Sequence, residues 1–287
     1  RAPVSIMTCR IAPDDKQVQK WLAEGVSIEV HTLTHPCPLL QKGNFQQAAN
    51  VVHGGVDLLS QIKGNKPVAY RMPCCDSMNS LSPRFFAGIF NETSAAGRFL
   101  QIDSSVFNIT TSKDKSLPRD WVLDKDGAER FAKYLPRKAM RAGMRTMGSY
   151  VGTIEDYPYP YVVNRLCWEF PCVVPSDWEA QNLIGNQQPK MLEDWKRALD
   201  VTVHKQGVMN LVFHPHGWSS SAQLVELIDY AQKTYGKKVK FLNFRECAER
   251  LNKNLLKGSA LRGKDGGDNA VRILDANNDG FMDVLIG

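Results

Sequence analysis

Short apolar runs rich in β-branched residues alternate with amphipathic stretches along most of the chain. After Phe45, for example, apolar side chains return at the spacing of one helical face, at Ala49, Val52, Val56 and Leu59. This alternation is typical of βα units around a parallel sheet. It predicts strands at residues 4–7, 26–30, 67–71, 99–103, 208–213 and 239–241, and helices at about 14–24, 45–63, 191–205, 224–235 and 245–256.

The alternation fails between Thr110 and Asn186, where six prolines interrupt the chain. We expect residues 110–186 to form an elaborated loop region over the mouth of the fold. The alternating tyrosines and prolines of residues 157–161 suit either a sugar-stacking wall or, as we favour, packing within this loop region. Past Lys257 the chain is rich in glycine and charge, which predicts a linker over residues 257–270.

The composition is that of a globular protein with a sizeable core, since 43% of the residues are hydrophobic and 23% are charged. A length of 287 residues suits one α/β barrel of about 250 residues plus a small extra piece. The sequence has no apolar run of about 18 residues, so we predict no membrane span. The net charge of +6 is dispersed except at Arg137, Lys138, Arg141 and Arg145, which we interpret as a solvated helix face rather than a nucleic-acid site.

The chain contains seven cysteines, an odd number, and none of them forms a Cys-x-x-Cys pair. This pattern predicts neither a disulfide framework nor a structural zinc site. We interpret the adjacent Cys74 and Cys75 as buried filler rather than as metal ligands.

Two histidines, His31 and His35, directly follow a predicted strand. Their spacing of four residues puts both imidazoles on one side of the chain, whether the backbone is extended or helical. They can therefore bind one metal ion. A catalytic divalent site needs about three protein ligands, so the pair is an incomplete set.

Two further chemically active residues lie at the ends of predicted strands. Arg71 ends the strand at 67–71, where a guanidinium can orient a carboxylate through a bidentate contact. His214 follows the strand at 208–213, and histidine is the side chain that most readily exchanges a proton near neutral pH. His216, two positions further on, competes for the same role.

Three of these segments together resemble the motifs of the polysaccharide deacetylase family with the NodB homology domain. Residues 31–35 resemble its H-[ST]-x-x-H motif, residues 71–73 its R-x-P motif, and residues 211–215 its L-x-x-H-P motif. The resemblance covers about residues 3–255 and implies a distorted (β/α) barrel.

The resemblance implies a reaction in which a metal-polarised water attacks the acetamide carbonyl of an N-acetylated polysaccharide. His31 and His35 are then the metal ligands, with zinc as the expected ion and cobalt or nickel as alternatives. Arg71 braces the catalytic base, and His214 is the general acid that protonates the leaving amine.

The family's first strand ends in paired aspartates that supply the base and the third metal ligand, and we expect it one βα unit before Val4. The barrel as it stands therefore lacks its first strand. Asp14 and Asp15 resemble such a pair, but they begin a helix and we interpret them as its cap.

A second departure concerns the carboxylate that tunes the acid histidine, because Val106 stands where the family's D-[SA]-x-D-W motif has its second aspartate. Asp177 is a candidate to restore part of that function. We also consider Asp177, Trp178 and Trp218 as candidate substrate-binding residues.

Residues 275–283 have oxygen ligands at alternate positions, a glycine for a tight turn and a closing acid, which suits calcium. The flanking residues 271–274 and 284–287 look like strands. The segment resembles the opening of an FG-GAP or VCBS-type propeller repeat, so we expect the repeats to continue past residue 287. The expected calcium ligands are Asp275, Asn277, Asp279, the carbonyl of Phe281, and Asp283.

We therefore expect three parts: a deacetylase-like barrel at 1–256, a linker at 257–270 and the start of a calcium-binding repeat at 271–287. The expected activity is metal-dependent removal of N-acetyl groups from a polysaccharide, which is hydrolysis of a non-peptide C–N bond. Calcium and a polymeric substrate favour a secreted or extracytoplasmic location. Two alternatives stay open: a non-catalytic carbohydrate-binding barrel, and an amidase acting on a small non-sugar amide.

Overall fold

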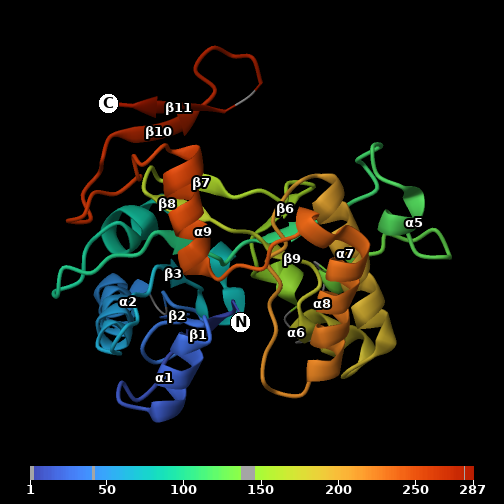
Figure 1. Ribbon diagram of the computed structural model, residues 1–287, viewed down its shortest axis with the longest axis horizontal. Coiled ribbons are helices and arrows are strands. Elements are labelled where there is room, and N and C mark those ends of the chain that lie inside the picture. The colour runs from blue at the N-terminus through green and yellow to red at the C-terminus, as the bar shows by residue number, and fades with distance from the viewer. Residues whose placement is uncertain (1–2, 41–42, 137–145, 281) are drawn as a thin grey trace. The chain divides into compact units, whose positions relative to one another are not determined.

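The computed structural model describes residues 3–40, 43–136, 146–280 and 282–287. It confirms the α/β class, because helices accompany sheets whose strands are mostly parallel (Figure 1). The basic stretch at 137–145 lies outside the described residues. The chain divides into two compact units: unit 1 is Arg1–Ser104, Tyr161–Glu169 and Phe241–Gly287, and unit 2 is Ser105–Pro160 and Phe170–Lys240.

The main sheet of unit 1 has six strands in the order β1-β2-β3-β4-β8-β7. Neighbours pair in parallel except β7, which is antiparallel to β8. The carboxyl ends of β2, β3 and β4 therefore meet at one end of the sheet, where the loops that follow can bring side chains together. The strands are β1 (Ser5–Thr8), β2 (Ser27–Val30), β3 (Ala69–Tyr70), β4 (Ile102–Asp103), β7 (Tyr161–Val163) and β8 (Cys167–Glu169).

Two helices of unit 1, α1 (Lys16–Ala23) and α2 (Phe45–Ser60), pack against β2 (Figure 1). Asp15 caps α1 by accepting a hydrogen bond from the Gln17 backbone N–H, which confirms its interpretation as a helix cap. The predicted apolar face of α2 is buried, and it shares one core with the sheet. The other helical segments of unit 1 are η2 (Pro73–Cys75), α3 (Ser77–Ser80), α4 (Pro83–Phe85), η3 (Phe86–Phe90), α9 (Phe244–Arg250) and η7 (Leu251–Leu255).

Unit 2 is built on a smaller parallel sheet in the order β6-β5-β9. Helices α6, α7 and α8 follow β9 along the chain. α7 packs against both α6 and α8 (Figure 1). The strands are β5 (Phe107–Ile109), β6 (Thr153–Glu155) and β9 (Cys172–Val173). The helical segments are α5 (Arg119–Val122), η4 (Ala132–Tyr134), η5 (Met147–Ser149), α6 (Asp177–Ile184), α7 (Pro189–His204), α8 (Ser221–Tyr235) and η6 (Gly236–Lys238).

The prediction of an irregular loop region over 110–186 was wrong for part of that segment. It contains β6 to β9 and α6, and β8 lies inside the main sheet, between β4 and β7. The strands escaped notice because they are only two or three residues long, and β8 and β9 are buried at every position. A strand buried on both faces shows no alternation of polar and apolar residues.

Two predicted strands are not regular strands in the structure. Within residues 208–213 only Asn210 forms a ladder contact, an isolated parallel bridge to Cys172. Residues 239–241 form no strand. Both runs contain exposed apolar side chains, such as Phe213 and Phe241. Their apolar composition therefore does not mark a strand buried in a sheet.

The described strands form two open sheets and a separate hairpin, and β1 stands at one edge of the larger sheet. The pairings thus establish parallel α/β architecture but not a closed barrel. Among the described residues, no helix is both long and apolar enough to cross a membrane.

The segment expected as a linker, residues 257–270, is anchored to unit 1 by Arg262. This side chain is 5% exposed, and its guanidinium donates hydrogen bonds to the carbonyls of Phe90, Asn91 and Leu100. It also lies 4.7 Å from the centre of the Phe99 ring. Beyond this anchor, β10 (Val271–Leu274) and β11 (Asp283–Ile286) form an antiparallel hairpin.

A buried carboxyl group in β2 makes the stability of unit 1 depend on pH. Glu29 is 0% exposed, and its Oε2 accepts hydrogen bonds from the backbone N–H groups of Val68 and Ala69. Burial raises the pKa of Glu29 from 4.5 to about 7, although these two hydrogen bonds act against the rise. The folded state therefore holds this proton more tightly than the unfolded chain, and stability falls as the pH rises from 4.5 to about 7.

We expect Glu29→Gln to remove this loss, because an amide fills the same space without ionising. Each pKa unit corresponds to about 1.4 kcal/mol, so the variant should gain up to about 3 kcal/mol over the parent protein between about pH 5 and about pH 8. Urea unfolding at both pH values measures the difference. Glu24→Gln, at an exposed position, is the matched control. A stability difference that is the same at both pH values would contradict the explanation.

Candidate functional site

The two histidines that follow β2 lie together in unit 1. The His31 and His35 ring centres are 4.9 Å apart, edge to face. The backbone between them is neither extended nor helical: Thr32 and His35 have φ angles of 65° and 56°, in the left-handed region. For a β-branched residue such as Thr32 this conformation is strained, and such strain clusters at functional sites. The Thr32 hydroxyl stabilises the turn by accepting a hydrogen bond from the His35 N–H at 3.0 Å.

The hydrogen bond on His31 identifies the ring nitrogen that carries the hydrogen. Its Nδ1 lies 2.8 Å from the backbone carbonyl oxygen of Arg71, and a carbonyl only accepts, so Nδ1 carries the hydrogen. In the neutral ring Nε2 then has the lone pair. A hydrogen bond of this kind orients most metal-binding histidines. The thiol of Cys9, just after β1, in turn donates to the His31 carbonyl at 2.9 Å.

Arg71 follows β3 and is buried, with an exposure of 9%. Its Nε donates to the Ser104 carbonyl at 2.9 Å, and its Nη2 donates to the Ser104 hydroxyl at 2.6 Å. Ser104 comes directly after β4, so the neighbouring strand holds the guanidinium in place. This partner was missed from the sequence, although Ser104 lies in the segment that resembles the family's aspartate motif.

A disulfide joins the loops that carry these residues, linking Cys37 to Cys74 with the two Cα atoms 6.2 Å apart. The cysteine pattern did not indicate this disulfide, and the interpretation of Cys74 as buried filler was wrong, because Cys74 is exposed. Cys75 is buried as expected. A signal was present: each cysteine follows a motif residue by two or three positions, and the two motifs end adjacent parallel strands.

In unit 2, the loop residue His214 is held by a buried carboxylate. Asp177 is 0% exposed, and its Oδ1 lies 2.7 Å from Nδ1 of His214. Its Oδ2 accepts a hydrogen bond from the His214 backbone N–H at 2.6 Å. An ionised carboxylate only accepts, so Nδ1 carries a hydrogen and Nε2 is the nitrogen left to exchange a proton. Asp177 thus occupies the position relative to His214 that the sequence proposed for it.

The local sequence explains how Asp177 reaches this position. It is the first residue of α6, and the Ser176 and Glu179 side chains form a capping box that fixes the start of the helix. Asp177 is fully buried and engaged with His214, and its expected contact with substrate stays a prediction.

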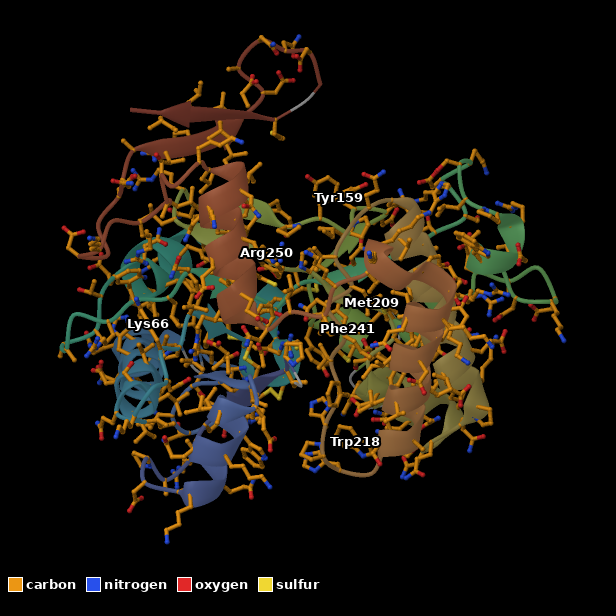
Figure 2. The ribbon with its side chains drawn as sticks, viewed as in Figure 1. Lys66, Tyr159, Met209, Trp218, Phe241 and Arg250 are labelled. Carbon is orange, nitrogen blue, oxygen red and sulfur yellow. A yellow bond between two sulfur atoms is a disulfide. The ribbon has the colours of Figure 1, made fainter. Side chains whose placement is uncertain are left out.

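Aromatic side chains surround His214 in the loop that leads into α8, where Figure 2 labels Trp218. The Trp218 ring centre lies 4.8 Å from that of His214 and 4.9 Å from that of His216. His214 and His216 stack with an interplanar angle of 14°. The contact with Asp177 distinguishes His214 from its competitor His216, which is exposed. Trp178 and Trp218 are both half-buried, so each presents some surface.

The tyrosines of residues 157–161 are held in part by packing. Tyr159 donates its hydroxyl hydrogen to the Lys205 carbonyl at 2.6 Å, and its ring lies edge to face against Tyr157. Tyr157 is 40% exposed.

The turn of the β10–β11 hairpin carries the residues predicted to bind calcium, with the exception of Phe281, which lies outside the described residues. Asp275 accepts hydrogen bonds from the backbone N–H groups of Asp279 and Gly280 at 3.1 and 2.9 Å. Asp283 accepts one from Ala276 at 3.0 Å. Asn278 and Gly280 have left-handed backbones, which are typical of tight turns.

Two groups of predicted site residues are thus assembled, each within its own unit. Unit 1 contains His31, His35 and Arg71, and unit 2 contains His214 and Asp177. Among the described residues, no group of three or more His, Cys, Asp or Glu side chains is arranged to hold a metal ion. No protein-family model matches the chain, and a search of curated proteins returned no match.

Proposed function

We propose that the protein is a metal-dependent carbohydrate N-deacetylase, a hydrolase of non-peptide C–N bonds. The observation that carries the proposal is the state of the histidine pair: His31 is oriented through Nδ1 by the Arg71 carbonyl, and the His35 ring lies 4.9 Å away. Two surface histidines without a shared function would need neither this hydrogen bond nor this short distance between their rings. The strained turn between the rings supports the same conclusion.

The residues present fit a divalent transition metal. Imidazole nitrogens suit zinc, cobalt and nickel, and the hydrogen bond on His31 Nδ1 is the outer-shell support that such ligands receive. Two ligands fall short of the usual three. The resemblance to the deacetylase family assigns the third ligand and the catalytic base to the paired aspartates of that family's first strand.

When bound, the metal would supply Lewis-acid polarisation of a water molecule and of the acetamide carbonyl. The protein's own residues supply proton transfer and orientation. The resemblance assigns protonation of the leaving amine to His214, and within unit 2 Asp177 keeps the His214 ring in the required tautomer through Nδ1. Arg71, anchored by Ser104, orients the carboxylate of the base.

Acetate release by the full-length protein tests the proposal across substrate classes: N-acetylglucosamine oligomers, peptidoglycan, other acetylated glycans and small non-sugar amides. We expect release from a glycan that stops with a chelator and is lost in His35→Ala. His204→Ala, an exposed histidine at the end of α7, should retain activity. Release from small amides alone would favour an amidase. Glycan binding without any release, unchanged in His35→Ala, would favour a binding protein.

We further propose that the β10–β11 turn binds calcium. The predicted ligands among its described side chains are three carboxylates and one amide, which are the hard oxygen ligands that calcium prefers. The hydrogen bonds of Asp275 and Asp283 already fold the turn into a compact loop. Calcium would therefore bind a largely formed site.

Replacing Asp275 by Ala should weaken calcium binding by at least about tenfold, because the affinity of such loops depends on the charge of their ligands. Calorimetric titration of the full chain with calcium chloride measures the effect, and Asp229→Ala, an exposed acid on α8, is the control. Equal stoichiometry and affinity in Asp275→Ala and the parent protein would contradict calcium binding at this turn.

A further inference from the structure

We propose that the Cys37–Cys74 disulfide positions the metal ligand His35, so that reduction of this bond weakens metal binding. The inference rests on the proposed function, because it concerns the same histidine pair. It starts from the fact that the disulfide joins the loop after His35 to the loop after Arg71.

The bridge is close to the ligand along the chain. Only Pro36 separates His35 from Cys37, so the bridged sulfur restrains the His35 backbone almost directly. The His35 side chain itself is exposed, and its backbone adopts the left-handed conformation that non-glycine residues avoid. A ligand in this conformation needs outside restraints to stay in place. The Thr32 hydroxyl is one such restraint, on the amino side, and the disulfide is another, on the carboxyl side.

The other end of the bridge is attached to a well-fixed loop. Arg71 is held by Ser104, Met72 is 0% exposed, and Pro73 is buried. The N–H of Cys75 donates to the Met72 carbonyl at 2.9 Å, which closes a tight turn around Cys74. The disulfide therefore couples an exposed ligand loop to a buried and hydrogen-bonded one. Cutting it leaves the Arg71 loop largely in place and releases the His35 loop.

The two cysteines differ in exposure, and we expect this difference to determine the course of reduction. Cys74 is exposed, whereas Cys37 is half-buried. A thiolate of an external dithiol therefore attacks Sγ of Cys74, the disulfide bond breaks, and Sγ of Cys37 leaves as a thiolate that takes up a proton. The second thiol of the reductant then resolves the mixed disulfide and frees Cys74. Two electrons pass from the dithiol to the protein, and the dithiol becomes a cyclic disulfide.

Metal titration of the oxidised and reduced full-length protein tests the inference. The reduced sample is prepared with dithiothreitol, which is removed under anaerobic conditions because it binds metal itself. We expect zinc and cobalt to bind about 10- to 100-fold more weakly after reduction, the range found when outer-shell support of a metal ligand is lost. The double variant Cys37→Ser/Cys74→Ser should bind like the reduced protein and should not respond to the reductant. Cys247→Ser should behave like the parent protein.

The outcomes separate this inference from the proposed function. If the oxidised protein binds one metal ion through His35 and reduction changes the dissociation constant less than twofold, the positioning role is overturned while the metal site stands. A lower resistance to urea after reduction with unchanged metal affinity would likewise show a purely structural disulfide. If neither form binds zinc or cobalt, both the inference and the proposed metal site are wrong.

Discussion

Asp177→Asn is expected to lower the turnover of acetate release on the order of 1,000- to 10,000-fold, the size of effect seen when an amide replaces the carboxylate behind a catalytic histidine. The Asn oxygen can still accept the hydrogen bond from the His214 backbone N–H. Its amide NH₂ group must then face Nδ1 of His214, and two donors cannot pair. Nδ1 therefore loses its hydrogen, and the protonated ring that acts as the acid is disfavoured.

Acetate release under saturating substrate measures this effect, and the far-ultraviolet circular dichroism of the variant should match that of the parent protein. Asp229→Asn, an exposed acid on α8, controls for the loss of one negative charge. His216→Ala controls for changes in the aromatic loop. If the turnover of Asp177→Asn stays within threefold of the parent, His214 does not act as an acid supported by Asp177. The expected loss of turnover is larger than this limit by about 100-fold or more.

The second large effect is expected for His31→Ala, which removes one ligand and the hydrogen bond to the Arg71 carbonyl. Zinc affinity should fall by more than about 100-fold, since loss of outer-shell support alone costs about 10- to 100-fold. Competition with a coloured chelator measures the dissociation constant. His204→Ala is the control, because His204 is exposed. His53→Ala is less suitable, because the His53 ring forms a hydrogen bond with the Ile89 carbonyl. Equal zinc affinity in His31→Ala and the parent would place any metal elsewhere.

The sequence predicted those parts of the fold that have long, one-sided hydrophobic patterns. Helices α2, α7 and α8 were found within a few residues of their ends, because each buries one face and exposes the other. β8 and β9 were missed for the opposite reason. Cys167 and Glu169 are buried along with Trp168 between them, so neither polarity nor periodicity marks the strand.

The candidate site was predicted residue by residue rather than as an arrangement. The motif at His31 and His35 suggested a shared metal, but its tight turn depends on left-handed backbones at Thr32 and His35 that no periodicity reveals. The contact between Asp177 and His214 was proposed because Val106 stands where the motif of the resembled family has a carboxylate. The disulfide went unpredicted, because pairing of cysteines 37 positions apart depends on which strands are neighbours.

The metal site at His31 and His35 is tested most directly by acetate release from full-length protein stripped of metal and then given one equivalent of zinc, with an N-acetylated oligosaccharide as substrate. We expect no release by the stripped protein and full recovery at one equivalent, with neither release nor recovery in His35→Ala. Release that continues after stripping, or recovery that is equal in His35→Ala and the parent protein, would contradict a metal site at His31 and His35.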